Sequence, residues 1–183
     1  MAKMITIIGP TACGRTAVAT QLAVRVGGEV ISADSRQVYR RMDIGTGKDL
    51  AEYEVGGRHV PYHLIDIAEP GTKYNLFQYQ HDFLKAYESI LARGAQPILC
   101  GGTGLYVEAG LPGYRLAAVP ENKELRERLE GKSLAELTEM LAELKRRNGS
   151  VMHNTTDVDT AKRAIRAIEI ETFNGENPTA GAE

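Results

Sequence analysis

The segment at residues 9–16 constrains the fold of this chain more than any other stretch of its sequence. It reads GPTACGRT and directly follows the apolar run MITII at residues 4–8. The spacing is that of G-x-x-x-x-G-K-[ST], a loop between a strand and a helix whose backbone N–H groups wrap a phosphate. Arg15 stands where this pattern has lysine, so the positive charge is carried by a bulkier, planar group. We therefore predict a phosphate-binding loop, with a ligand-free turn as the alternative.

Composition excludes several classes of protein. The 183 residues carry 22 basic and 24 acidic side chains, a formal charge of −2, so the chain has no general cationic surface for nucleic acid. Its two cysteines, Cys13 and Cys100, lack the spacing of a metal site and argue against a disulfide scaffold. The apolar run near the N-terminus is too short for a signal peptide or a membrane helix. We expect a soluble, cytoplasmic protein with no membrane contact, in which any RNA contact comes from a local basic patch.

Strand-like segments alternate with helical patterns through the first part of the chain. The predicted strands are residues 4–8, 29–33, 62–67 and 96–100. Asp34 follows the second strand and Asp66 lies at the end of the third, where carboxylates face the ligand crevice of such sheets. Strands separated by helices form a mostly parallel sheet covered on both faces. We predict an α/β fold of the P-loop nucleoside-triphosphate-hydrolase-like type, a mostly parallel sheet flanked by helices, with a small helical insertion.

The predicted helices belong to the core or to the insertion. A helix that begins in the loop has Val18, Leu22 and Val26 on one face, and a second apolar stripe runs along residues 76–90. Strand signals then stop, and Ser133 begins a capping box that opens a leucine-striped helix. The predicted parts are a P-loop core at 1–114, a helical insertion at 115–150, a helix at 151–173 that returns to pack on the sheet, and a frayed tail at 174–183.

Three clusters of polar residues lie where chemistry can occur. Asp34 is a candidate general base near the loop, although aspartate before serine is also a common helix N-cap. In the turn GGTGLY at residues 101–106, Thr103 and backbone amides can bind a second anionic group, or the turn serves close packing alone. The third cluster is a cationic stripe on the last predicted helix, or merely a solvated face. It consists of Lys162, Arg163 and Arg166.

Five stretches of the sequence occur in an order typical of one known family. They are GPTACGRT at 9–16, SADSRQVYR at 32–40, MDIGTGK at 42–48, HLIDI at 63–67 and GGTGLY at 101–106. Together, over about residues 1–172, they resemble the dimethylallyl (isopentenyl) transferases acting on adenine, above all the bacterial tRNA dimethylallyltransferases, the IPP transferase family. The resemblance implies that a dimethylallyl group passes from dimethylallyl diphosphate to N6 of an adenine, with adenosine of the tRNA anticodon loop favoured, and that diphosphate is released.

The resemblance also implies a role for individual residues. Asp34, Thr103 and Arg15 match the catalytic positions, with Asp34 as the general base. The implied diphosphate-binding residues are Gly9, Pro10, Thr11, Ala12, Cys13, Gly14, Arg15 and Thr16, and Thr16 is also the implied ligand of Mg²⁺. The implied contacts to adenine or tRNA are Asp34, Ser35, Arg36, Gln37, Lys162, Arg163 and Arg166. Lys162 departs from the glutamine of the family's Gln-Arg-x-x-Arg stretch.

Several alternatives remain open at the level of sequence. Family members usually continue with a further helical segment, so we expect a monomeric short form lacking that C-terminal segment. Such a chain is a compact tRNA enzyme, an enzyme for a free adenine nucleotide, a truncated gene product or a weakly active remnant. Outside the family, strand, phosphate loop and helical lid also describe a kinase for a nucleotide or metabolite. A phosphate-binding module without catalysis is the nonenzymatic alternative.

Overall fold

The chain divides into two compact units, residues 1–116 and 117–183. A computed structural model describes residues 3–10, 12–111, 119–150 and 156–177. The first unit contains all the strands of the described residues, and the second is helical. Among the described residues, no helix is both long enough and apolar enough to cross a bilayer.

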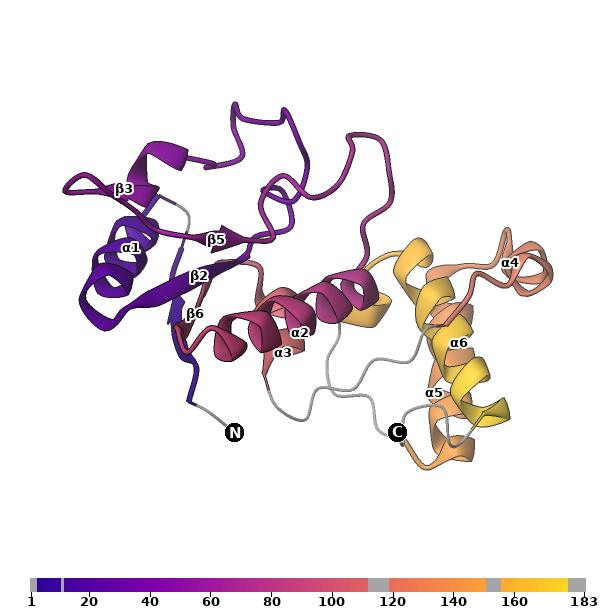
Figure 1. The fold of residues 1–183 in the computed structure, drawn as a ribbon. Coiled ribbons are helices and arrows are strands. Elements are labelled where there is room, and N and C mark those ends of the chain that lie inside the picture. The colour runs from indigo at the N-terminus through magenta and orange to yellow at the C-terminus, as the bar shows by residue number, and fades with distance from the viewer. Residues whose placement is uncertain (1–2, 11, 112–118, 151–155, 178–183) are drawn as a thin grey trace. The chain divides into compact units, whose positions relative to one another are not determined.

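The first unit is built on a four-stranded sheet whose strands all run parallel, as predicted (Figure 1). In spatial order the strands are β1 (Ile5–Ile8), β6 (Gln96–Gly101), β2 (Gly28–Ala33) and β5 (Tyr62–His63). A short antiparallel pair, β3 (Glu54–Val55) with β4 (Arg58–His59), follows the 3₁₀ turn η1 (Leu50–Tyr53). In the ladder between β2 and β6, Ala33 lies opposite Gly101, so these two strands end side by side. Their carboxyl ends carry the polar residues described below.

Helices cover both faces of this sheet (Figure 1). On one face α1 (Arg15–Val26) packs its alanines against Val30 and Ile98. On the other face α2 (Leu76–Ala92) and α3 (Gly104–Gly110) pack against Ile31 and Leu99. Consecutive strand residues thus enter opposite cores, because side chains alternate across a pleated strand. Strand β2 is fully buried between these two cores, and the chain leaves its carboxyl end at the polar residues described below.

Two details of the core differ from the sequence-based expectation. The third strand ends at His63 and not at Asp66, because Leu64 and Asp66 have φ values of 63° and 56°, which interrupt an extended ladder. The inner face of α1 is formed by Ala19, Thr20 and Ala23, whereas Val18 is 57% exposed. Small side chains on this face let the helix lie close to the sheet.

In the second unit, the described residues form three α-helices that pack around an apolar core of their own. Its helices are α4 (Lys123–Leu129), α5 (Leu134–Asn148) and α6 (Ala161–Glu176), with the 3₁₀ turn η2 (Thr156–Val158) before the last. The predicted capping box of Ser133 with Glu136 opens α5. The residues of its core are Leu125, Leu129, Leu137, Leu141, Ala164 and Ile168.

The apolar stripe of α6 lies in the core of the second unit, and the packing of residues 151–173 on the sheet stays a prediction. Ala164 and Ile168 of α6 are buried against Leu137 and Leu141 of α5, so the apolar stripe is satisfied inside the helical unit. The helix also continues to Glu176, into the segment predicted to be frayed. Residues 178–183 of that segment lie outside the described residues.

A single buried carboxylate holds α4, α6 and the segment before α4 together. The Glu169 side chain, 1% exposed, accepts hydrogen bonds from Asn122 N (2.7 Å), Arg126 Nε (2.8 Å) and Arg166 Nη1 (2.6 Å). Arg166 Nη2 also donates to the carbonyl of Val119 (2.8 Å). Burial opposes the charge of Glu169, but hydrogen bonds from Arg126, Arg166 and Asn122 outweigh it and lower the pKa to about 2.

The acid stability of the helical unit tests this arrangement. Because the folded pKa of Glu169 lies below the unfolded value, its stabilising effect is complete above about pH 4.5 and is lost as the pH falls toward 2. Glu169→Gln should lower the free energy of unfolding by roughly 3 kcal/mol at pH 7, and the difference from wild type should vanish near pH 2. Denaturant unfolding across this pH range measures the difference. Glu127→Gln, on the exposed surface of α4, is the control, and a pH-independent difference for Glu169→Gln would contradict the assignment.

Candidate functional site

The predicted phosphate loop lies between β1 and α1 as a tight turn. Ala12 and Gly14 have φ values of 60° and 77°, in the left-handed region that lets a short loop curl back to a helix. Gly14 is the N-cap of α1 and makes no side-chain cap, so the first N–H groups of the helix remain available to an anion. Thr11 lies outside the described residues.

A pocket of ≈ 110 Å³ opens over this loop. The loop contributes Ala12, Cys13, Gly14, Arg15 and Thr16, and the facing wall is formed by Asp34, Gln37, Thr46, Gly47, Asp49 and Glu52. The structure therefore brings together two clusters that are separate in the sequence, the phosphate loop and the segment after β2. Thr46, Gly47, Asp49 and Glu52 are wall residues that the sequence analysis did not assign to the site.

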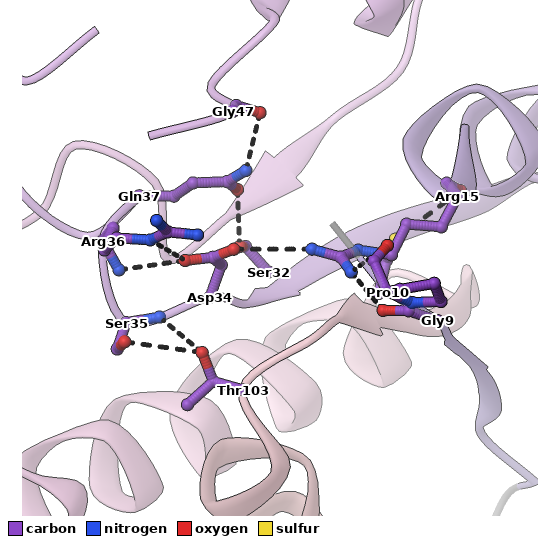
Figure 2. A network of polar contacts seen from close by, with 11 residues as sticks. Gly9, Pro10, Arg15, Ser32, Asp34, Ser35, Arg36, Gln37, Gly47 and Thr103 are labelled. Atoms are coloured by element: carbon purple, nitrogen blue, oxygen red, sulfur yellow. Dashed lines mark hydrogen bonds and ion pairs between the residues drawn. The ribbon is translucent and has the colours of Figure 1, made fainter. Parts of the chain in front are cut away.

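Arg15 links the phosphate loop to the segment after β2 (Figure 2). Its Nη1 atom donates to the carbonyl oxygens of Gly9 and Pro10, the latter at 3.0 Å. Its Nη2 atom lies 3.5 Å from Asp34 Oδ2. The fork of the guanidinium thus serves the loop with one nitrogen and the carboxylate with the other, a division that one ammonium group cannot make in the same way.

Asp34 precedes a turn and does not cap a helix, so the N-cap alternative is wrong, whereas its role as general base stays a prediction. Its Oδ1 atom accepts a hydrogen bond from the backbone N–H of Arg36 at 3.0 Å, the pattern of a turn stabilised by an aspartate side chain. Its Oδ2 atom faces Arg15. The residue is 5% exposed yet lines the pocket, so it is a shielded carboxylate held within reach of a bound molecule.

Gln37 is fixed at both ends of its side-chain amide (Figure 2). Its Oε1 atom accepts a hydrogen bond from Ser32 Oγ at 2.9 Å, and its Nε2 atom donates to the carbonyl of Gly47 at 2.9 Å. Since Gln37 lines the pocket, the protein presents one oriented amide there.

Thr103 and Ser35 contact each other beside the pocket and do not line it. Thr103 Oγ1 accepts from Ser35 N at 3.1 Å and donates to Ser35 Oγ at 3.4 Å, and Thr103 N donates to Ala33 O at 3.1 Å. The turn at residues 101–106 therefore braces the segment after β2. Its last residue, Tyr106, stacks on Tyr79 with ring centroids 3.9 Å apart, and burial, with the nearby charges of Tyr39 and Asp34, raises the pKa of its hydroxyl to about 12.

The predicted cationic stripe lies on α6 in the helical unit. Arg166 is bound to Glu169 and to Val119 O, as described above. Arg163 is exposed and pairs with Asp159 at 2.7 Å, and Lys162 is exposed. Arg166 therefore has a structural partner inside its own unit, whereas Lys162 and Arg163 lie on the surface of α6.

Lys48 is a further residue of this region to which the sequence analysis assigned no role. It appeared there only as the last letter of MDIGTGK, without a role. In the structure its ammonium group is buried between Asp43, Asp66 and the carbonyl of Tyr39. The only signal in the sequence was that Asp43 and Thr46 lie shortly before Lys48. This spacing does not by itself indicate that the lysine is buried.

Comparison with known proteins places these features in a family. The family model described as IPP transferase matches residues 37–182, and the one described as isopentenyl transferase matches residues 2–62. The chain is 63% identical to "tRNA dimethylallyltransferase 1" of Porphyromonas gingivalis, covering 98% of this chain and 58% of that protein. It is 61% identical to "tRNA dimethylallyltransferase 2" of Bacteroides fragilis, covering 96% and 56%. The chain thus spans little more than half the length of these relatives.

Solved structures agree with the predicted fold class. The tRNA isopentenylpyrophosphate transferase from Bacillus halodurans is similar with a TM-score of 0.61 and 36% identity, over 96% of this chain and 57% of that one. A eukaryotic dimethylallyltransferase acting on tRNA is similar with a TM-score of 0.75 and 26% identity, over 98% and 44%. The α/β prediction with a mostly parallel sheet is therefore confirmed.

Two neighbouring glycines give a matched test of the geometry at Arg15. A Cβ atom on Gly102 would lie 2.4 Å from Arg15 Nη1, the mobile end of a side chain, whereas one on Gly101 would lie 2.3 Å from the backbone oxygen of Ala33. Gly102→Ala should therefore fold normally but weaken binding of inorganic diphosphate roughly tenfold by displacing the guanidinium. Gly101→Ala should lower the free energy of unfolding by about 3 kcal/mol or more.

Calorimetric titration and thermal unfolding measure the two effects. The double variant Gly102→Ala with Arg15→Lys should regain part of the lost affinity, because lysine is slimmer at this site. Normal diphosphate binding by Gly102→Ala would show that Arg15 takes no part in holding the anion.

Proposed function

The chain belongs to the IPP transferase family, and we propose that it transfers a dimethylallyl group from dimethylallyl diphosphate to N6 of an adenine, with adenosine in tRNA as the acceptor. The observation that carries this proposal is the pocket in which a phosphate loop faces the shielded carboxylate of Asp34. The names of the relatives and the tRNA-acting structural neighbour support tRNA as the acceptor. A monomer in the cytoplasm completes the proposal.

One wall of the pocket suits the leaving diphosphate of this reaction, and the other suits the acceptor nitrogen. The acceptor nitrogen forms a bond to the carbon of the dimethylallyl group that carries the diphosphate. The bond between this carbon and the diphosphate oxygen breaks, and its electron pair leaves with the diphosphate. Negative charge therefore grows on the side of the loop, where the N–H groups at the start of α1 and the guanidinium of Arg15 are donors. The acceptor nitrogen loses a proton, and the carboxylate of Asp34, which lines the pocket, would take it.

Arg15 has to rearrange when the diphosphate enters. In the structure its Nη1 atom is bound to carbonyl oxygens of the loop, which do not compete well with a polyanion for a guanidinium. Turning Nη1 to the diphosphate can leave Nη2 next to Asp34. Arg15 then separates two negative groups, the diphosphate and the carboxylate, whose direct contact would be repulsive.

Magnesium fits this donor set as a partner of the substrate. Mg²⁺ commonly keeps several waters and takes only one or two protein ligands beside phosphate oxygens. Thr16 lies in the first turn of α1 and lines the pocket, and the described residues contain no cluster of His, Cys, Asp and Glu that could hold the ion alone. Thr16 would hold the ion against the diphosphate, where its charge stabilises the leaving group.

Transfer of labelled dimethylallyl groups tests the proposal. The chain is incubated with labelled dimethylallyl diphosphate and, in parallel, with unmodified tRNA, AMP and ATP. Label in tRNA with release of diphosphate is the expected result. Label in AMP or ATP would identify a free nucleotide as the acceptor. Formation of ADP from ATP without label transfer would identify a kinase, and diphosphate binding without turnover a noncatalytic module.

Asp34→Asn assigns the proton-handling role in the same assay. Asparagine keeps the shape and can still accept from Arg36 N, but it cannot take a proton. Turnover should fall by roughly 10²–10⁴, while the affinity for dimethylallyl diphosphate changes little. Weaker diphosphate binding at an unchanged rate would instead make Asp34 part of the anion site.

The exposed residues of α6 are proposed to contact RNA phosphates. Replacing Lys162 and Arg163 together by alanine should weaken tRNA binding and flatten its dependence on salt, because each phosphate contact releases bound counterions. Filter binding at several salt concentrations measures the slope. Lys123 and Arg128, both exposed on α4 of the same unit, provide a double-alanine control of equal charge. An equal loss of tRNA affinity in both double variants would indicate a general effect of charge and contradict a specific contact by α6.

A further inference from the structure

The ammonium group of Lys48 is completely buried beside the site. Its side chain is 0% exposed, and Nζ donates to Asp66 Oδ1 (2.5 Å), Tyr39 O (2.8 Å) and Asp43 Oδ1 (3.0 Å). These acceptors come from two segments of the first unit, residues 39–43 and the turn at Asp66. A buried ammonium group is stabilised only when its N–H groups are hydrogen-bonded. Lys48 therefore holds its three acceptors in place.

One of these partners reaches Gln37 through the backbone. Asp66 N donates to Gln37 O at 3.1 Å, and Asp66 O accepts from Arg40 Nε at 2.8 Å. Asp66 has the positive φ value that ended the third strand early, so its carboxylate and its N–H serve different neighbours. The side chain of Asp66 therefore anchors Lys48 while its backbone anchors Gln37.

A second connection runs through the loop that leads to Lys48. Thr46 Oγ1 closes the loop by donating to Met42 O at 2.6 Å, and Gly45 and Gly47 have φ values of 76° and 68°. Gly47, the residue bonded to Lys48, directs its carbonyl to Gln37 Nε2 at 2.9 Å. Movement of Lys48 would therefore move the acceptor of the Gln37 amide.

The orientation of that amide matters for recognition. Ser32 occupies one lone pair of Gln37 Oε1, and Gly47 occupies one N–H of Nε2. A carboxamide has two donors and two acceptor sites, so one N–H and one lone pair remain for a molecule in the pocket. A side-by-side donor and acceptor matches the edge of adenine that presents an amino group beside a ring nitrogen.

We propose that Lys48 is a positioning residue for the acceptor base, acting through Gly47 and Asp66 to fix the amide of Gln37. The inference rests on the proposed function, because it takes the base in the pocket to be an adenine. Lys48 itself does not line the pocket. Burial alone would lower the pKa of Lys48, but hydrogen bonds and charges from Asp66 and Asp43 outweigh it and raise the pKa, so the anchor stays charged at neutral pH.

Lys48→Met removes the ammonium group but keeps the length of the side chain. Asp43 and Asp66 are 66% and 33% exposed, so water can solvate both carboxylates and the variant should fold. The KM for the adenine acceptor should rise roughly tenfold, the scale of one lost base-edge contact, while the KM for dimethylallyl diphosphate stays within about twofold. Asp43→Asn, which keeps an oxygen acceptor, should show a smaller shift of the same kind.

The matched control is Arg93→Met. Arg93 Nη2 pairs with Glu29 Oε2 at 2.6 Å near the opposite end of β2, so this variant removes an ion pair of the same unit away from the site. It should leave both KM values unchanged. Equal increases of the two KM values in Lys48→Met, or the same pattern in Arg93→Met, would overturn the proposal.

A double-mutant cycle tests whether Lys48 acts through Gln37. In a Gln37→Ala background, Lys48→Met should raise the acceptor KM by less than about twofold, because the amide that it positions is gone. A full tenfold effect in that background would show that Lys48 acts by another route and overturn the proposal.

The side-chain amide resonances of Gln37 separate this proposal from the proposed function. In Lys48→Met they should shift toward the values of a solvated amide, as the hydrogen bond to Gly47 O is lost, and in Arg93→Met they should not move. Unchanged resonances in Lys48→Met would overturn the positioning role whether or not the chain transfers a dimethylallyl group. Shifted resonances in a chain without transfer activity would retain the role and reject the function.

Discussion

The close approach of β2 and β6 at their carboxyl ends is the constraint on which the site depends. Ala33 and Gly101 lie opposite each other, and the backbone oxygen of Ala33 fills the space that a side chain at 101 would need. The oxygen also accepts from Thr103 N, so the chain leaving β6 turns immediately beneath the chain leaving β2. Glycine at 101 is therefore required by contact with another backbone, and the polar residues after both strands are brought together as a consequence.

Residues 34–37 are held from several directions as they leave β2. Thr103 braces Ser35 from the turn after β6, Gly47 holds Gln37 from the loop before Lys48, and Arg15 meets Asp34 from the start of α1. These contacts come from parts of the chain far apart in sequence, and each uses a polar group that burial would otherwise leave unsatisfied. The carboxylate and the amide are thus presented to the pocket in a preorganised state, which reduces the reorganisation required when substrates bind.

The sequence predicted those parts of the fold that depend on local signals. Glycine spacing at residues 9–16 and the alternation of strands with helices were sufficient for the phosphate loop and the parallel sheet, and the rule that strand ends share one edge placed Asp34 near the loop. Other features depend on tertiary contacts. The left-handed backbone at Leu64 and Asp66 is supported by pairing with residues 37–40, and α6 finds its apolar partner on α5. Lys48 was missed because its burial requires Asp66, which lies 18 residues further along the chain.

The contacts of Arg15 with the loop and with Asp34 explain the arginine in the phosphate loop better than anion binding alone does. A lysine would supply the charge, but its single nitrogen would have to choose between the loop carbonyls and Asp34. The guanidinium spans both, with Nη1 on Gly9 and Pro10 and Nη2 toward Asp34, and it lies over Gly102 because that residue has no side chain. The same residue therefore shapes the loop and links it to Asp34, and in the proposed function it separates that carboxylate from the diphosphate. A side chain at residue 102 would displace this guanidinium, so the arrangement of Arg15 seen here depends on glycine at residue 102.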